Sequence, residues 1–199
     1  MRLLVATTNP HKVEEIRRVL DGADVEIATL DRWPVVVPPD ETGRTFEENA
    51  RAKAEYYARA TGELTVAEDS GLEIDALGGA PGVHSARYGG EGATYPDKFA
   101  LIYRALDARP SAARFVCALA LASPVRIVFE ARGTVEGHVA PAPTGGGGFG
   151  YDPIFFYPPY GRTLAEVTPE EKTAVSHRGQ AFRRLREYLG QERKDRKDR

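Results

Sequence analysis

Short apolar runs alternate with longer segments of helical periodicity along this chain, and this alternation is the feature that most limits its fold. Apolar runs at 2–7 and 24–30 flank the segment 9–22, where apolar residues recur at helical spacing between a proline and a glycine. A second helix is predicted at 45–62, with a threonine as its cap and a glycine at its end. The chain therefore opens as strand, helix, strand, helix.

The later segments add strands that pair directly. The apolar segments 113–122 and 126–139 are separated by Ser123-Pro124 and are predicted to form an antiparallel pair. The segment 63–77 is interpreted as two apolar stretches around an acidic loop, and 94–108 as another helix. Strands that alternate with helices and also pair as a hairpin indicate an α/β fold with a mixed sheet.

The length of the chain favours one domain. With 199 residues, 42% of them hydrophobic, the chain can bury a substantial core, and we expect a single domain over 1–190. A last helix is predicted at 176–190. The segment 191–199 mixes charges too closely to pack, so it is expected to be a frayed, solvated tail.

Composition excludes several classes of partner. The 27 Lys and Arg residues against 29 Asp and Glu residues give a net charge of −2, which argues against nucleic acid and anionic membranes as partners. The N-terminal apolar run is too short for a signal peptide or a membrane span, so a cytoplasmic protein is expected. Cys117 is the only cysteine and lies in an apolar segment, where a small core residue is expected.

The loop after the first predicted strand, "TTNPHK" (7–12), could bind an anion. It places hydroxyls, an amide and Lys12 at the start of a helix, where unpaired N–H groups attract negative charge. It lacks the glycines and the Lys-Ser/Thr pair of a Walker A motif. A capped helix with a surface lysine remains an alternative.

Several carboxylates occur without histidines or cysteines at metal-ligand spacing. Glu41 and the pair Glu68-Asp69 offer hard oxygen ligands, which suit Mg²⁺ or Mn²⁺. Asp69 is predicted at the end of a strand, a common position for ligand sites, although a simple turn is an alternative. Glu47 and Glu48 are better explained as first-turn residues of a helix, where they offset its dipole.

Two further segments could bind a ligand. In the run "TGGGGFGYDPIFF" (144–156), four glycines are followed by aromatic residues, an aspartate and a proline, which is not typical of a flexible linker. A ligand loop and a tight turn are both compatible with this pattern. The segment "EEKTAVSHRGQAF" (170–182) contains Lys172, Ser176, His177 and Arg178. These side chains could donate hydrogen bonds to a ligand, or Ser176 could cap a helix whose basic side chains are exposed.

These motifs occur in a distinctive order along the chain, together with the segments "ETGRTFEENARAKA" and "AEDSGLEIDALGGAPGVHSARY". In this order the chain resembles the Ham1/inosine triphosphatase family, from Leu3 to about Leu189. The resemblance implies an elongated mixed sheet flanked by helices, in two lobes with the active site in the cleft between them. It also implies a homodimer that uses Mg²⁺, with Mn²⁺ as a substitute. The implied activity is hydrolysis of non-standard purine triphosphates (dITP, ITP, XTP) to monophosphate and pyrophosphate, which keeps deaminated purines out of DNA and RNA.

The resemblance also implies a role for individual residues. Asp69 would be the general base and, with Glu41 and Glu68, would bind the metal. Glu68 stands where many relatives have aspartate, and its extra methylene could make it an indirect partner of the metal. The resemblance places Thr7, Asn9, Lys12 and Lys53 on the phosphates, Phe149, Gly150, Tyr151 and Asp152 on the nucleoside, and Lys172, His177 and Arg178 on the base. Thr8, and Ser70 beside the acidic residues, are also implied to bind the substrate.

Arg178 carries donors only, so it would favour bases with an acceptor at O6 over adenine. Two alternatives stay open. One is a pyrophosphatase for pyrimidine or modified-base triphosphates, and the other is a nucleotide sensor without turnover.

Overall fold

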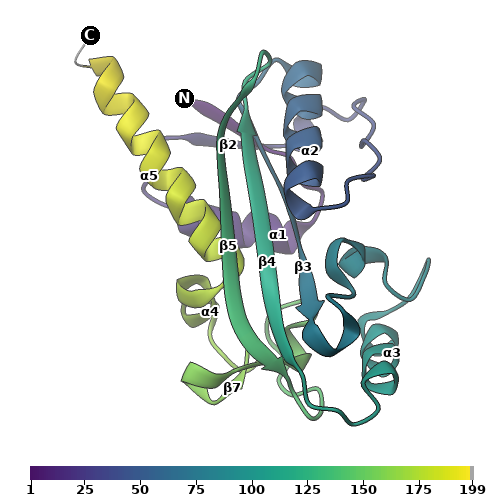
Figure 1. Ribbon diagram of the computed structural model, residues 1–199. Coiled ribbons are helices and arrows are strands. Elements are labelled where there is room, and N and C mark those ends of the chain that lie inside the picture. Colours follow the sequence, from purple (N-terminus) through teal and green to yellow (C-terminus); the bar gives the residue numbers. More distant parts are fainter. Residues whose placement is uncertain (198–199) are drawn as a thin grey trace. The chain divides into compact units, whose positions relative to one another are not determined.

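The computed structural model describes residues 1–197, and across them the chain forms a seven-stranded sheet with the order β2-β1-β3-β4-β5-β6-β7 (Figure 1). The strands are β1 (Arg2–Val5), β2 (Glu26–Thr29), β3 (Thr65–Ile74), β4 (Ala112–Ala122), β5 (Ile127–Val139), β6 (Phe155–Tyr157) and β7 (Arg162–Thr163). The α-helices are α1 (Pro10–Leu20), α2 (Phe46–Thr61), α3 (Tyr95–Leu106), α4 (Pro169–Val175) and α5 (His177–Lys197). Short 3-10 turns lie at Leu30–Arg32, Asp75–Leu77, Gly82–Arg87, Asp152–Ile154 and Pro158–Tyr160.

The sheet is mixed, as the sequence predicted. β1 pairs in parallel with both β2 and β3, whereas β5, β6 and β7 pair in antiparallel order. A tight turn joins β4 to β5, closed by the amide of Ser123 donating to the carbonyl of Arg126 at 2.9 Å. The α/β class is therefore confirmed.

The chain divides into two compact units. Unit 1 contains Met1–Asp69, Cys117–Gly133 and the C-terminal segment from His177, and unit 2 contains Ser70–Val116 and Thr134–Ser176. The chain passes between the units along β3, β4 and β5, so each of these strands contributes residues to both. The single domain over 1–190 stays a prediction.

Unit 1 has an apolar core between its sheet and two helices. Helices α1 and α5 pack against each other (Figure 1), and α5 contributes Phe182 and Leu185 to the core. The predicted caps of two helices are confirmed. Asn9 caps α1, and Thr45 caps α2, which ends at Gly62 in the left-handed conformation with φ of 74°.

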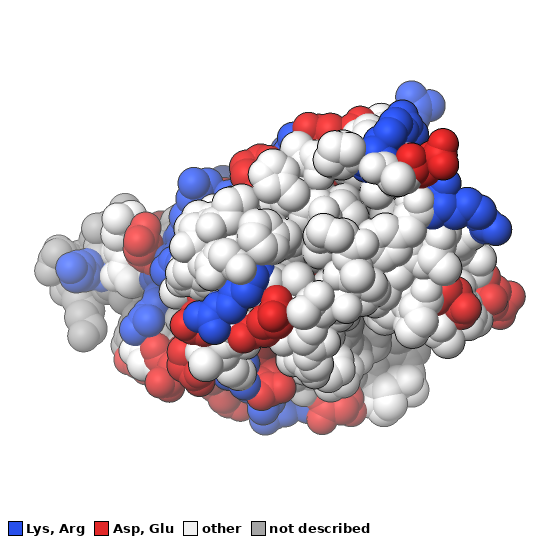
Figure 2. Space-filling model, turned by 90° about the horizontal axis from the view of Figure 1, so that it is seen from below, with Lys and Arg blue, Asp and Glu red and all other residues white. Residues whose placement is uncertain are grey.

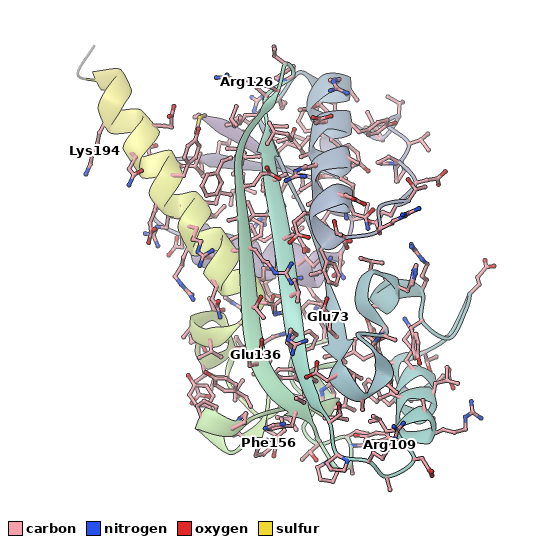
Figure 3. The ribbon with its side chains drawn as sticks, viewed as in Figure 1. Glu73, Arg109, Arg126, Glu136, Phe156 and Lys194 are labelled. Atoms are coloured by element: carbon pink, nitrogen blue, oxygen red, sulfur yellow. The ribbon has the colours of Figure 1, made fainter. Side chains whose placement is uncertain are left out.

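Unit 2 has its own core, in which Phe99 and Ile102 of α3 pack with Phe155 and other apolar side chains. Another face of its strands carries charges. Arg114 of β4 forms ion pairs with Glu73 of β3 at 3.7 Å and with Glu136 of β5 at 3.1 Å. Glu73 and Glu136 are labelled in Figure 3. Such cross-strand pairs between opposite charges stabilise neighbouring strands.

Two predictions about local structure need correction. The acidic segment at Glu68-Asp69 is not a loop, because β3 runs without interruption from Thr65 to Ile74. Both carboxylates lie inside this strand and are buried, which is possible because lysine and arginine side chains neutralise them. The last helix does not end at 190 but continues to Lys197, since Gln, Glu, Arg and Lys are good helix formers. Of the predicted tail, residues 198–199 lie outside the described residues.

The surface agrees with the near-neutral net charge. On the face shown in Figure 2, Lys and Arg lie interspersed with Asp and Glu, and uncharged residues cover most of the area. Within residues 1–197, none of the helices combines the length and apolar character needed to cross a membrane.

Candidate active site

The loop between β1 and α1 is folded around a side-chain cap. The Oδ1 atom of Asn9 accepts from the amides of His11 at 3.0 Å and Lys12 at 3.4 Å, and the hydroxyl of Thr7 accepts from the amide of Asn9 at 3.2 Å. Thr7 and Thr8 also line a hollow of about 700 Å³ in unit 1. The helix cap is therefore confirmed, but Lys12 is not a simple surface lysine, because it pairs with the buried Glu68. Phosphate binding at this helix start stays a prediction.

Glu68 is the centre of a buried ion cluster in unit 1. Its Oε1 atom lies 2.7 Å from the ammonium of Lys12 and 3.2 Å from the guanidinium of Arg178, which also pairs with Glu15 at 2.6 Å. The thiol of Cys117 donates to Oε2 of Glu68 at 3.5 Å. Burial alone would raise the pKa of Glu68, but Arg178 and Lys12 outweigh it and hold that pKa well below its usual range. Glu68 is thus ionised and fixed between two cations.

The neighbouring Asp69 belongs to a second cluster of unit 1. The ammonium of Lys53 lies 2.5 Å from Oε1 of Glu41 and 4.0 Å from Oδ1 of Asp69. The amide of Asn49 donates to Oδ2 of Asp69 at 2.8 Å. Burial raises the pKa of Asp69 above its ordinary value, and Lys53 and Asn49 offset only part of this effect. A raised pKa makes this carboxylate a better proton acceptor.

The donor atoms of this second cluster fit Mg²⁺. Glu41 and Asp69 both lie within 4.0 Å of the ammonium of Lys53, and Mg²⁺ is commonly bound by one or two carboxylates together with substrate phosphates. The described residues hold no group of three or more His, Cys, Asp or Glu side chains arranged as a metal site. Because two cations already pair with Glu68, Glu41 and Asp69 are the better candidates for direct ligands.

In unit 2, the predicted nucleoside loop is fixed by a buried ion pair. The ammonium of Lys172 donates to Oδ2 of Asp152 at 2.5 Å and lies 4.5 Å from the centroid of the Phe149 ring. The same carboxylate oxygen accepts from the amide of Phe149 at 2.7 Å. The loop, its aromatic ring and its lysine are therefore held in one arrangement.

The glycine run is explained by close packing of this loop. At Gly148, which has φ of +66°, a Cβ atom would lie 2.2 Å from the carboxylate of Asp152. At Gly145, with φ of +90°, it would lie 2.5 Å from the backbone of Ala165. These positions need glycine both for their backbone angles and for the approach of neighbouring atoms. The run is thus a closely packed bend that leads into the loop at Phe149, and ligand binding by this loop stays a prediction.

A group of side chains that sequence reasoning did not identify supports the same loop. Tyr151 donates its hydroxyl to the carbonyl of Ser85 at 2.8 Å, and its ring meets that of Tyr95 edge to face at 5.3 Å. The Tyr95 hydroxyl lies 3.5 Å from where a Cβ of Gly150 would be. The ammonium of Lys98 lies 4.7 Å from the centroid of the Tyr95 ring. A tyrosine in the first turn of a helix carries no pattern that marks it as a loop support.

The predicted site residues are distributed over both units, and their roles stay predictions. Unit 1 holds Thr7, Thr8, Asn9, Lys12, Glu41, Lys53, Glu68, Asp69, His177 and Arg178, and unit 2 holds Ser70, Phe149, Gly150, Tyr151, Asp152 and Lys172. The set predicted for the base is divided at Ser176. Lys172 contacts the nucleoside loop within unit 2, whereas Arg178 contacts Glu15 and Glu68 within unit 1.

Comparison with known proteins identifies the family. Residues 3–188 match the model of the Ham1 family. The chain belongs to the Ham1 family. A dITP/XTP pyrophosphatase of Exiguobacterium sp. is 47% identical over 186 residues, covering 93% of this chain and 95% of that protein. The dITP/XTP pyrophosphatase of Thermus thermophilus is 46% identical over 189 residues, covering 94% and 91%.

Solved structures of Ham1 proteins have the same fold. A HAM1 protein from Coxiella burnetii superposes with a TM-score of 0.89 at 39% identity, covering 96% of this chain and 99% of that one. The nucleoside-triphosphatase / dITP/XTP pyrophosphatase of Mycobacterium abscessus gives a TM-score of 0.76 at 44% identity, covering 93% and 98%. The family predicted from the order of motifs is thereby confirmed.

Proposed function

We propose that this Ham1 protein hydrolyses non-standard purine nucleoside triphosphates, dITP, ITP and XTP, to the monophosphate and pyrophosphate. The observation that carries the proposal is the cluster around Asp69, where a buried carboxylate of raised pKa lies beside Lys53, Asn49 and Glu41. The activity named for its relatives, dITP/XTP pyrophosphatase, supports the same reaction.

The reaction needs a water molecule aimed at the α-phosphorus and a group that accepts its proton. We assign proton acceptance to the carboxylate of Asp69. Lys53 and Lys12 are the cations of unit 1 that we assign to the phosphate oxygens. Each is paired with a carboxylate in the structure, Lys53 with Glu41 and Lys12 with Glu68, and each would exchange that carboxylate for a phosphate oxygen when the substrate binds.

We further propose Mg²⁺, with Mn²⁺ as a substitute, as the cofactor. Glu41 and Asp69 would hold it, and Glu68 would act through the cations that surround it. When bound, the metal supplies positive charge that stabilises the leaving pyrophosphate.

The loop at Phe149 is assigned to the nucleoside. One face of the Phe149 ring meets the ammonium of Lys172, which orders the ring for stacking on a purine. Lys172 is the donor that we assign to an acceptor on the base. Arg178 could donate to a base only by giving up part of its pairing with Glu15 or Glu68. We therefore expect Arg178 to contribute to base choice less directly than Lys172.

The wider role follows from the reaction. Removal of deaminated purine triphosphates keeps them out of DNA and RNA, and we propose that the protein does this in the cytoplasm as a homodimer. The family resemblance supports both statements.

A substrate panel tests the proposed reaction. The protein is incubated with ITP, XTP, dITP, GTP, ATP and UTP in Mg²⁺, and pyrophosphate and orthophosphate are assayed separately. We expect pyrophosphate from the first three, loss of activity in excess chelator, and its return with Mg²⁺ or Mn²⁺. Orthophosphate as the first product would contradict the proposed bond cleavage. A preference for pyrimidine triphosphates, or binding without turnover, would favour the alternatives.

A further inference from the structure

Asn49 of α2 is buried, with 2% of its surface exposed, and both ends of its amide are used. Its Nδ2 atom donates to Oδ2 of Asp69 at 2.8 Å, and its Oδ1 atom accepts from the backbone amide of Gly43 at 2.8 Å. The backbone N–H can only donate and an ionised carboxylate can only accept. The two partners therefore fix the orientation of the amide without ambiguity.

Gly43 is shaped for this contact. A Cβ atom at position 43 would lie 2.5 Å from Oδ1 of Asn49 and 2.9 Å from Cβ of Glu48, closer than real Cβ contacts come. The absence of a side chain lets the backbone reach the amide of Asn49. Gly43 lies in the same segment as Glu41, which pairs with Lys53. Asn49 thus connects the segment of Glu41 to the carboxylate of Asp69.

We propose that Asn49, held by Gly43, is a positioning residue that sets the orientation of the Asp69 carboxylate for the reaction. With Oδ2 fixed by the amide, Oδ1 is the oxygen on the side of Lys53, at 4.0 Å from its ammonium. A carboxylate held in one rotamer presents the same oxygen to the attacking water in every turnover. The inference rests on the proposed role of Asp69 and adds the residues that orient it.

The Asn49→Asp variant separates positioning from structural support. Aspartate has the size of asparagine and still accepts from the amide of Gly43, but it offers Asp69 no N–H and places a second carboxylate beside it. The variant therefore removes the hydrogen bond that holds Oδ2 of Asp69 and places a like-charged group next to it, so the Asp69 carboxylate loses its fixed orientation. We expect kcat for ITP at saturating Mg²⁺ to fall at least 10-fold, with KM changed less than 3-fold and Tm close to that of the native protein.

Gly43→Ala disturbs the same contact without altering Asn49. The added Cβ pushes the amide from its place, so kcat should again fall, by about 5- to 10-fold, with little change in KM. Gly190→Ala in α5 is the matched control, because a Cβ there meets nothing within 4 Å, and its kcat should equal that of the native protein. Gly43→Ala therefore tests the proposal even if Asn49→Asp folds poorly.

Asp69→Asn, measured beside these variants, distinguishes the two possible failures. If Asp69→Asn retains its kcat, the role of Asp69 in the proposed function is wrong and the inference is lost with it. If Asp69→Asn loses about 10²-fold or more while Asn49→Asp or Gly43→Ala keeps kcat within 2-fold, the proposed function stands and Asn49 is only a structural residue. A loss of kcat in all three variants supports the inference.

Discussion

Arg178 is fully buried between Glu15 and Glu68, and its charge has consequences for stability as well as for function. Burial disfavours its charged form, but the two carboxylates outweigh this and raise its pKa further. The guanidinium is therefore permanently charged. It keeps the buried carboxylate of Glu68 ionised in the interior of unit 1.

We expect Arg178→Ala to lower the free energy of unfolding by about 3–5 kcal/mol, because the change leaves the buried carboxylate of Glu68 without its main partner. Urea denaturation of the purified variant measures this. Arg59→Ala removes an arginine whose side chain is 61% exposed and paired only with Glu55 one turn away, so its effect should stay within about 0.5 kcal/mol. Equal effects of the two changes would show that the Glu68 cluster does not hold unit 1 together.

The same residue shows why part of the site could not be predicted from sequence. The local sequence marks three residues as polar groups near a helix start or a turn, namely Lys12, Glu68 and Arg178. The order of the motifs indicates the family. Their mutual contacts join three distant parts of the chain, which local periodicity does not record. The sequence alone therefore indicates a ligand donor at Arg178 and cannot indicate that its guanidinium pairs with Glu15 and Glu68.

At the level of elements, caps and turns were the most predictable features. Asn9 and Thr45 satisfy helix amides by short-range contacts, so their positions are visible in a few residues of sequence. The break predicted in β3 was wrong for the opposite reason. A Glu-Asp pair normally indicates a loop, and only cations supplied by α1, α2 and α5 allow it to lie inside a strand.

The first turn of α3 gives a prediction about the nucleoside loop. Tyr95 packs against Tyr151 and Gly150, so Tyr95→Ala should loosen the loop and raise KM for ITP about 3- to 10-fold, with kcat little changed. Tyr95→Phe keeps the ring and should restore most of the affinity. Tyr103→Phe removes a hydroxyl from the same helix, one that donates to the carbonyl of Ala140, and should leave KM unchanged.

Steady-state kinetics with ITP at fixed Mg²⁺ measure all three variants of α3. A normal KM in Tyr95→Ala would mean that Tyr151, held by Ser85, needs no further support. A raised KM in Tyr103→Phe as well would mean that the whole helix, rather than its first turn, acts on the loop.

For the molecule as a whole, the chemistry divides between the two units. The carboxylates and lysines assigned to the triphosphate belong to unit 1, and the aromatic ring and lysine assigned to the nucleoside belong to unit 2. If this assignment is correct, substitutions in unit 1 should weaken the binding of any triphosphate, including inorganic tripolyphosphate. Substitutions in unit 2 should weaken the binding of nucleoside triphosphates only.

Inorganic tripolyphosphate, which has no base, tests this division as a competitive inhibitor of ITP hydrolysis. Phe149→Ala should weaken ITP binding by about 5- to 150-fold, since stacking of a base on an aromatic ring contributes about 1–3 kcal/mol. Its inhibition constant for tripolyphosphate should stay within about 2-fold of the native value. Lys53→Ala removes a charged donor and should weaken both ligands by about 10-fold or more. If Phe149→Ala weakened tripolyphosphate as much as ITP, the loop of unit 2 would be acting on the phosphates, and its assignment to the nucleoside would be wrong.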